Sequence, residues 1–308
     1  MHAVVTQKLE IAPRVVEIAL RPAEGDFPSW EPGAHIDVQL PGMSRQYSLV
    51  SDPSDTSEYR IAVLREEHGG GGSAYLHDTL MVGDEVQFTG PRNHFALQDA
   101  SHHILLAAGI GITPILAMAE ALRARSMSFS VVYTSRDPGG MPYRERVQRL
   151  PDARLHFSGE SGRLDVASIV SQIPPGGRVY CCGPGGFIDA ARDAAAGMPP
   201  DTVIYEKFQA DEPVGPRAGD SAIEVECVRM GKTIRVGPEE SILDALNRAG
   251  AGIERDCGEG ICGTCEVKVI EGDIDHRDEV LLDSEKDAGD VMLVCCSRVR
   301  GGRLVLDI

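Results

Sequence analysis

The sequence lacks any hydrophobic run that approaches the roughly 18–20 apolar residues of a membrane-spanning helix, which excludes an integral helical membrane protein. It is also poor in basic residues: 30 Lys and Arg stand against 47 Asp and Glu, a formal net charge of −17. Nucleic acid is therefore not an expected partner, because phosphate contacts need a basic face. The excess acid either keeps the protein soluble or steers it toward a basic patch on a protein partner.

The first 20 residues lack the pattern of a secretory signal peptide, because polar and apolar residues alternate as they do in a strand. Cysteine is sparse, with 8 in 308 residues, whereas a secreted scaffold held by disulfides is shorter and denser in cysteine. Internal repeats and low-complexity tracts are missing as well. The length predicts a globular protein of two or three domains.

Four cysteines near the C-terminus have an informative spacing. Cys257, Cys262 and Cys265 read C-x4-C-x2-C, and Cys295 follows after a long gap, which is the plant-type [2Fe–2S] spacing. Glycines between them let the backbone fold around sulfides and aim N–H groups at them. A zinc site would more often show two separate C-x2-C pairs. Since thiolates that hold iron must stay reduced, we expect a cytoplasmic location.

The fourth ligand is ambiguous from the residues alone, because Cys296 follows Cys295 directly. A β-strand points adjacent side chains to opposite faces, so on a strand only one of the two can face the iron. Cys181 and Cys227 have no partner at a ligand spacing. We expect both to be small buried hydrophobes.

The hydrophobic pattern predicts a β domain at the N-terminus. Up to about Gln98 the chain forms short alternating runs separated by turn signals. Two examples are Ala34–Leu40 and Glu58–Leu64. Regular short strands of this kind predict an antiparallel barrel or a sandwich.

The pattern then becomes that of a parallel α/β sheet. An apolar run at Ile104–Ala108, a helical stretch from Pro114 to Arg125 and a second apolar run at Phe129–Tyr133 give strand, helix and strand. A stretch rich in proline, glycine and charge reads as a linker before a last part of ferredoxin size. We predict a first domain at 1–98, a second at 99–210, a linker at 211–220 and a third domain at 221–308.

Two glycine-rich turns in the second domain predict a dinucleotide site. In the first, Gly109 and Gly111 allow a tight turn and the approach of a pyrophosphate, Thr113 can cap the next helix, and Pro114 suits its first position. The alternative is a plain structural turn. The second turn is Cys182-Gly183-Pro184-Gly185. Both turns would lie at the carboxyl edge of one parallel sheet, where such sheets bind ligands.

Three further side chains bear on the nucleotide. Cys182 either contacts a nicotinamide ring or only packs. Arg136 could pair with the 2′-phosphate of NADPH, whereas Asp137 would repel it and bind a ribose hydroxyl. We predict a preference for NADH.

A hydride carries two electrons and a [2Fe–2S] cluster takes one, so a flavin is needed between them. Arg45 could pair with the flavin phosphate, Tyr47 could lie against the ring, and Ser48 could hydrogen-bond near its reactive edge. The glycine run before Ser73 suits a terminal phosphate. The alternatives are exposed strand residues and a flexible loop; the order of these motifs favours the flavin.

The chain resembles the phthalate dioxygenase reductase family, and within it the vanillate O-demethylase reductases, over essentially all of its length. The resemblance rests on five stretches and on the cysteine set with the ending Leu304–Ile308. The stretches are Arg45–Ser48, Gly70–Ser73, Pro91–Phe95, Gly109–Pro114 and Cys182–Gly185. The fold that it implies is a flavin-binding antiparallel β-barrel, a parallel α/β NAD-binding domain and a C-terminal plant-type ferredoxin of the β-grasp type.

The resemblance also implies the cofactors and their residues. It implies FMN, with its phosphate at Arg45 and at the loop of Gly71, Gly72 and Ser73, and with Tyr47 and Ser48 at the isoalloxazine. It places Phe208 beside the flavin ring, although Gln209 stands where many relatives have glycine. It assigns the fourth iron ligand to Cys295. Ser48, Cys182 and Phe208 are the residues expected at the reacting atoms.

The implied activity is that of a reductase component. Electrons would pass from NADH to FMN, to the cluster and to a terminal oxygenase, Rieske-type and acting on an aromatic acid or ether. We expect the reductase to be monomeric on its own. A haem-thiolate monooxygenase is an alternative acceptor, and a non-enzymatic redox sensor is an alternative of another class.

Overall fold

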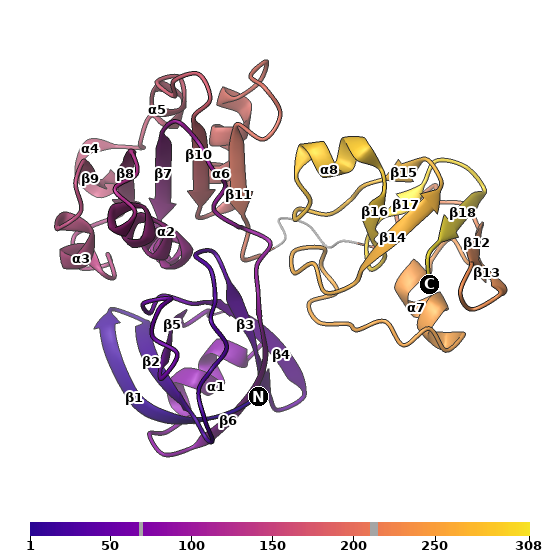
Figure 1. The fold of residues 1–308 in the computed structure, drawn as a ribbon, viewed down its shortest axis with the longest axis horizontal. Helices are drawn as coiled ribbons and strands as arrows, with labels where there is room; N and C mark the ends of the chain where they lie inside the picture. Colours follow the sequence, from indigo (N-terminus) through magenta and orange to yellow (C-terminus); the bar gives the residue numbers. More distant parts are fainter. Residues whose placement is uncertain (68–69, 210–214) are drawn as a thin grey trace. The chain divides into compact units, whose positions relative to one another are not determined.

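The computed structural model describes residues 1–67, 70–209 and 215–308. It divides into two compact units, Met1–Glu206 and Lys207–Ile308 (Figure 1). The first unit holds a six-stranded and a five-stranded sheet, and the second holds a five-stranded mixed sheet and the two-stranded sheet β15-β17. Within the described ranges, no helix is both long enough and apolar enough to cross a bilayer.

The first sheet of unit 1 is antiparallel, with the strand order β4-β3-β6-β1-β2-β5. A bridge between Leu49 and Ile61 joins its two edges, which gives it the form of a barrel. Inward side chains such as Ile18, Ile36 and Phe88 are fully buried, because strand residues alternate between core and surface. The elements are β1 (His2–Ala12), β2 (Val15–Pro22), β3 (His35–Leu40), β4 (Met43–Ser48), β5 (Tyr59–Leu64), α1 (Gly72–Asp78) and β6 (Glu85–Arg92).

The second sheet is parallel throughout, with the order β11-β10-β7-β8-β9. The chain leaves β7 on one side to form β8 and later returns to its other side as β10, so the strand order reverses between β7 and β10. Ligands of open α/β sheets bind at the carboxyl edge of that point. The elements are β7 (His103–Ala108), a 3-10 turn η1 (Gly109–Gly111), α2 (Ile112–Ala124), β8 (Phe129–Ser135), α3 (Arg144–Gln148), β9 (Ala153–Phe157), α4 (Ser158–Ser161), α5 (Val166–Val170), β10 (Arg178–Cys182), α6 (Gly185–Ala194) and β11 (Val203–Glu206).

Hydrogen bonds connect the barrel to the parallel sheet inside unit 1. The Tyr143 hydroxyl, just before α3, donates to Glu17 of β2 at 2.8 Å. Arg146 of α3 donates to the carbonyl of Val50 at 3.2 Å. These bonds hold the barrel against the parallel sheet, so residues of both can form one site within unit 1.

Unit 2 has a five-stranded mixed sheet with the order β13-β12-β18-β14-β16. Helix α7 begins after Ser241, whose hydroxyl accepts the Asp244 N–H at 3.0 Å, and it buries Leu243 and Leu246 in the core. The elements are β12 (Ile223–Cys227), β13 (Lys232–Val236), α7 (Ile242–Arg248), β14 (Glu266–Glu271), β15 (Ile274–Asp275), α8 (Asp283–Ala288), β16 (Val291–Leu293), β17 (Arg298–Val299) and β18 (Arg303–Leu306).

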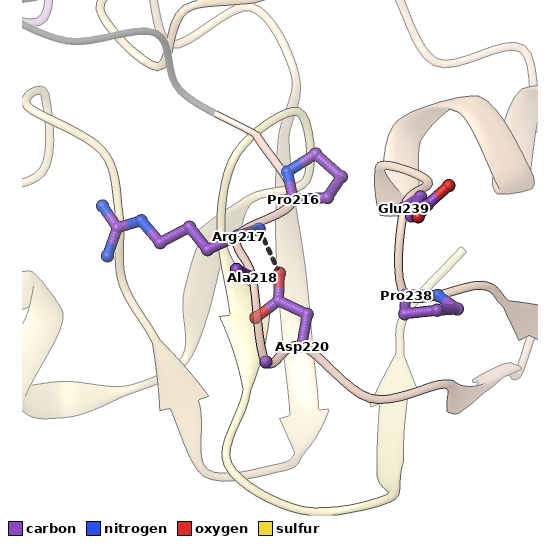
Figure 2. Close-up of a pocket in the computed structure, with 7 residues that line it drawn as sticks. Pro216, Arg217, Ala218, Asp220, Pro238 and Glu239 are labelled. Carbon is purple, nitrogen blue, oxygen red and sulfur yellow. Dashed lines mark hydrogen bonds between the residues drawn. The ribbon is translucent and has the colours of Figure 1, made fainter.

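Residues 215–220 of the predicted linker are bound to unit 2, while 210–214 lie outside the described residues. Asp220 pairs with Arg277 at 2.6 Å, and Arg298 lies 3.6 Å from its other oxygen. Figure 2 shows the Arg217 N–H, which donates to Asp220 at 2.7 Å. These donors, led by Arg277, hold the pKa of Asp220 well below its usual range. The boundaries predicted at 98/99 and 220/221 stay predictions.

Candidate functional site

The two glycine-rich turns touch each other at the carboxyl edge of the parallel sheet. A Cβ placed on Gly111 would lie 2.3 Å from the carbonyl oxygen of Cys182, and one on Gly183 would lie 2.8 Å from the Cβ of Ala108. Only glycine permits such close approach at these two positions. The shared edge expected from the sequence is present, and Gly111 also serves the contact between the turns.

Thr113 and Pro114 do not occupy the positions expected from the sequence. Helix α2 begins at Ile112 after the η1 turn, and no side chain caps it among the described residues. The Thr113 side chain is buried inside the first turn, where its hydroxyl donates to the Ile110 carbonyl at 3.1 Å. Capping by Thr113 was therefore wrong, because the 3-10 turn runs directly into the helix. Pro114 still falls in the first turn, whose N–H groups need no helical partner.

The second turn leads into α6. Pro184 is its extended N-cap residue, and no side chain of the described chain caps the helix. The first N–H groups of α6, at Gly185 and Gly186, are therefore left for another acceptor. They lie beside the Gly109 turn through the contact of Gly183 with Ala108. The arrangement suits an anion with two phosphates.

The end of β8 carries the side chains predicted to sense the nucleotide. Asp137 and Arg136 are both exposed. One carboxylate oxygen of Asp137 accepts the Gly140 N–H at 2.9 Å, which folds the loop back on itself. The Arg136 carbonyl accepts the Gly159 N–H at 2.8 Å. The backbone is thus fixed at both residues.

A buried carboxyl that the sequence reasoning missed connects the barrel to the nucleotide edge. Glu206 ends β11 in register with Cys182 of β10, and it hydrogen-bonds to the buried Ser48 of β4. Its Oε2 has no hydrogen-bond partner within the described residues. Burial, the dominant cause, raises the pKa of Glu206 to about 8. The carboxyl is therefore neutral at pH 7 and can donate a hydrogen bond.

Cys182 shares this buried environment. Burial first, and then the nearby Glu206, raise the pKa of the Cys182 thiol well above its usual range. It stays a thiol at neutral pH, so it packs or contacts a ligand without acting as a nucleophile. The stretch Tyr205–Phe208 at the end of β11 is the sequence feature that could have indicated Glu206. The resemblance assigned a role in this stretch to Phe208 alone.

The predicted phosphate loop surrounds Arg45. A Cβ on Gly70 would lie 2.6 Å from the Arg45 guanidinium, and one on Gly72 would lie 2.8 Å from its Cγ. Gly71, with φ 90°, precedes α1, which has no side-chain cap among the described residues. The Ser73 hydroxyl oxygen accepts the Glu66 N–H at 3.0 Å, which leaves its proton to donate. Cation, hydroxyl and free N–H groups together suit a phosphate; Gly69 lies outside the described residues.

Two residues predicted at the flavin ring lie on different units. Tyr47 is half-buried against the barrel core, and burial raises its pKa to about 12, so its hydroxyl stays neutral. Phe208 belongs to unit 2 and is 40% exposed. Its place beside the ring stays a prediction.

The four cysteines predicted as iron ligands form two pairs in unit 2. The side chains of Cys257 and Cys262 hydrogen-bond to each other, and so do those of Cys265 and Cys295. Among the described residues, no group of three or more His, Cys, Asp or Glu side chains is arranged to hold a single ion. Two thiolate pairs fit a two-iron cluster, in which each iron takes two cysteines.

The backbone around these thiols also suits a cluster. Gly258, Gly260 and Gly263 have φ of 69°, 68° and 74°, a left-handed conformation that glycine adopts readily. The Glu259 N–H points at Cys257 Sγ, 3.2 Å away, and the Gly260 N–H donates to Cys295. N–H groups aimed at sulfur stabilise the charge of a bound cluster.

Cys295 and Cys296 lie in a turn that follows β16, and not on a strand. The opposite-face argument does not apply there, because a turn brings adjacent side chains together. Cys295 is the one that pairs with Cys265. Cys181 and Cys227 are fully buried, as predicted.

Comparison with known proteins agrees with this arrangement. Three family models match: the oxidoreductase FAD-binding domain over residues 5–127, the N-terminal domain of the dimethylamine monooxygenase subunit DmmA-like over 91–202, and the 2Fe-2S iron-sulfur cluster binding domain over 225–300. The carnitine monooxygenase reductase subunit of Escherichia coli (strain K12) is 39% identical over 293 residues, with 92% of this chain and 90% of the relative covered.

Phthalate dioxygenase reductase of Burkholderia cepacia is 36% identical over 313 residues, which cover 99% of this chain and 96% of the relative. The chain belongs to the phthalate dioxygenase reductase family. A solved structure of phthalate dioxygenase reductase matches it with a TM-score of 0.71 and 35% identity, over 100% of this chain and 98% of that one. The resemblance and the fold class predicted from the sequence are confirmed.

This chain also resembles part of larger proteins. The structure of an intact type IV self-sufficient cytochrome P-450 monooxygenase matches this chain with a TM-score of 0.93 and 37% identity. The match covers 100% of this chain. The chain spans only 41% of that protein. The family establishes an electron-transfer oxidoreductase with a flavin-binding domain and a [2Fe–2S] domain.

Proposed function

We propose that this protein oxidises NADH and delivers the electrons singly, through FMN and a [2Fe–2S] cluster, to a partner oxygenase. The contact of Ser48, Glu206 and Cys182 carries this proposal, because it joins the predicted flavin strand to the predicted nucleotide edge. A hydride donor and a flavin need to meet at such a point. Phthalate dioxygenase reductase carries electrons from pyridine nucleotides to [2Fe–2S].

The nucleotide binds at the edge where β7 and β10 end. Gly109, Gly111 and Gly183 let the pyrophosphate approach the backbone, and the N-terminus of α6, after Pro184, faces its charge. Thr113 supports this edge from inside α2. At the end of β8, Asp137 takes the ribose hydroxyl and repels a 2′-phosphate, so NADH is preferred despite Arg136.

The flavin is FMN, held at its phosphate by Arg45, Ser73 and the start of α1 at Gly71 and Gly72. Tyr47 lies against the ring, and the family likeness assigns Phe208 to the same ring. When bound, FMN accepts a hydride and returns the two electrons one at a time.

The Ser48–Glu206 pair keeps the hydride-transfer region uncharged. With a pKa of about 8, Glu206 holds its proton at neutral pH and offers it as a hydrogen-bond donor. A neutral donor stabilises negative charge that develops nearby, which an ionised carboxylate would oppose. Cys182, also neutral, excludes water from the same space.

Cys257, Cys262, Cys265 and Cys295 would hold the cluster, which takes up and passes on one electron at a time when bound. The acceptor of its electrons is an oxygenase, as the names of the carnitine and phthalate relatives suggest. A Rieske-type enzyme is the first candidate. A haem-thiolate monooxygenase is the second, favoured by the match to the self-sufficient cytochrome P-450 monooxygenase. Since thiolates that hold iron must stay reduced, the proposed location is a reducing compartment such as the cytoplasm.

The test uses the purified holoprotein. Acid extraction and chromatography should release one FMN per chain, and stoichiometric FAD would contradict the flavin assignment. NADH should support rapid cytochrome c reduction, with kcat/KM well above that for NADPH. No NADH-dependent reduction would overturn the reductase and favour a redox sensor. Reconstitution with a Rieske oxygenase and with a haem-thiolate monooxygenase then separates the two acceptors.

A further inference from the structure

A buried tyrosine hydroxyl lies between the first glycine turn of the nucleotide edge and the loop that precedes α3. Tyr133 of β8 is fully buried, and its hydroxyl donates to the carbonyl of Gly109 at 3.0 Å. The carbonyl of Pro142 lies 3.1 Å from the same hydroxyl. A phenol has one proton and a carbonyl has none to donate, so the two carbonyls share a single donor. Burial raises the pKa of Tyr133 well above its usual range, so the hydroxyl keeps this proton at neutral pH.

The carbonyl of Gly109 sets the direction of the N–H group that follows it in the chain. It accepts the Ile112 N–H at the end of η1 as well as the Tyr133 hydroxyl, so both of its lone pairs are engaged. The peptide bond is planar and trans, so the Ile110 N–H points opposite to this carbonyl and away from Tyr133. An N–H group at the start of a helix has no partner inside the helix. A Cβ on Gly109 would meet no atom of the described residues within 4 Å, which leaves room for a ligand beside the turn.

The loop on the other side of the hydroxyl is fixed on the barrel of the same unit. Pro142 precedes Tyr143, whose hydroxyl donates to Glu17 of β2 at 2.8 Å. Tyr143 and Ile110 also pack against one apolar cluster of the barrel, which consists of Ala12, Val15 and Ala62. The Tyr133 hydroxyl thus connects the nucleotide turn to a loop that the barrel holds in place.

We propose that Tyr133 is a positioning residue for the nucleotide: its hydroxyl fixes the Gly109 carbonyl and so aims the Ile110 N–H at the pyrophosphate of NADH. The inference rests on the proposed function, which places NADH on this turn. Without the hydroxyl, two carbonyl oxygens of like partial charge lie near each other with no proton between them, and the Pro142 carbonyl loses a buried donor. The turn then shifts, and the N–H loses its aim.

The test is stopped-flow reduction of the flavin by NADH in the full-length holoprotein. In Tyr133→Phe, which lacks only the hydroxyl, the Kd for NADH should rise about three- to tenfold, the usual effect of losing one hydrogen bond. The limiting rate at saturating NADH should stay within about twofold of the wild type, because the hydroxyl does not touch the reacting atoms. Tyr180→Phe is the matched control. It removes a buried hydroxyl of β10 that donates to the Ala96 carbonyl at 3.2 Å, and it should change neither value.

A hydride donor without phosphate shows whether the pyrophosphate is the group affected. N-benzyl dihydronicotinamide should reduce the flavin equally fast in the wild type and in Tyr133→Phe. An unchanged Kd for NADH in Tyr133→Phe would overturn the inference, and so would an equal loss with both donors, since the hydroxyl would then only support the fold. A wild-type flavin that NADH does not reduce would instead overturn the proposed function.

A second measurement decides the case if Tyr133→Phe does not fold. It uses amide hydrogen exchange of the wild-type holoprotein with and without NAD⁺, followed by mass spectrometry. Exchange at the Ile110 N–H, in peptides that cover this turn, should slow when NAD⁺ binds. Binding of NAD⁺ without slower exchange at Ile110 would show that this N–H does not face the nucleotide, and the inference would be wrong. Absence of NAD⁺ binding would count against the proposed function.

Discussion

Two carboxyl groups with little exposure to solvent, Glu206 in unit 1 and Asp220 in unit 2, are held in opposite ways. Among the described residues no cation pairs with Glu206 of unit 1, and burial raises its pKa to about 8. Asp220 in unit 2 is bound by Arg277 and flanked by Arg298, and these donors lower its pKa. The cost of burying a carboxyl is thus met by a proton in one unit and by arginines in the other. A carboxyl group that is kept protonated by burial, at a place where two sheets meet, indicates a functional role. A carboxyl group that forms ion pairs with arginines indicates a role in stability.

The largest effect is expected from substitution of Glu206, the carboxyl group that burial keeps protonated. Glu206→Ala should lower kcat for NADH-to-ferricyanide turnover about 10²-fold, the usual cost of removing one donor from developing charge. Glu206→Gln keeps a neutral donor and should retain most of the rate. Stopped-flow reduction of the flavin by NADH measures the step directly. A full rate in Glu206→Ala would show that the carboxyl only packs.

Substitution of Asp220 should lower the stability of unit 2 and leave the turnover rate unchanged. Asp220→Asn removes the carboxylate shared by Arg277 and Arg298, although Arg277 keeps Asp275 at 2.7 Å, and should destabilise unit 2 by about 2 kcal/mol. Loss of visible cluster absorbance in denaturant reports that unit. The only tryptophan, Trp30, lies in the barrel core, so its fluorescence reports unit 1 and should not change. A slower NADH-to-ferricyanide rate in this variant would contradict the division of roles.

The two carboxyls should also give opposite pH dependences of stability. The unfolded chain releases the Glu206 proton near pH 4.5 and the folded chain near pH 8, so the unfolding free energy of unit 1 should fall as pH rises across that window. The difference between wild type and Glu206→Gln, followed by Trp30 fluorescence, should be on the order of 1–3 kcal/mol. For Asp220, whose folded pKa is lowered, stability is lost as pH falls below the ordinary aspartate range.

The smallest effect is expected at the exposed acids near the cluster loop. Charge reversal at Glu254 and Glu259 should slow reduction of the partner oxygenase at low salt, and the difference from wild type should close at high salt. NADH-to-ferricyanide turnover should stay the same in the variant. Equal partner reduction at low salt would mean that these acids only solvate the loop.

The parts of this molecule that the sequence predicted are those with a local signal. The cysteine spacing predicted the four thiols that pair, and the glycine turns after Ala108 and Cys182 predicted one shared edge. Strands such as Tyr59–Leu64 follow from alternation along the chain. Each of these depends on residues that lie close together in sequence.

The parts that it missed depend on contacts between distant segments. Glu206 matters because the register of β11 on β10 places it opposite Cys182, and because Ser48 comes from another sheet. The turn at Cys295 and Cys296 could not be read either, because an apolar run ending in two cysteines is equally typical of a strand. The sequence did not reveal the three-residue 3-10 turn that runs into the helix. The helix therefore begins at Ile112, and Thr113 lies inside its first turn and not at its cap.

The contact between Gly111 and Cys182 limits how the nucleotide site can change. Each turn occupies the space that a larger residue or an insertion in the other turn would need. A change in the length of one turn therefore requires a matching change in the other. The end of β8 carries no such constraint, because Arg136 and Asp137 are exposed. Laboratory selection for a different pyridine nucleotide should therefore collect its substitutions around these two residues and leave both glycine turns as they are.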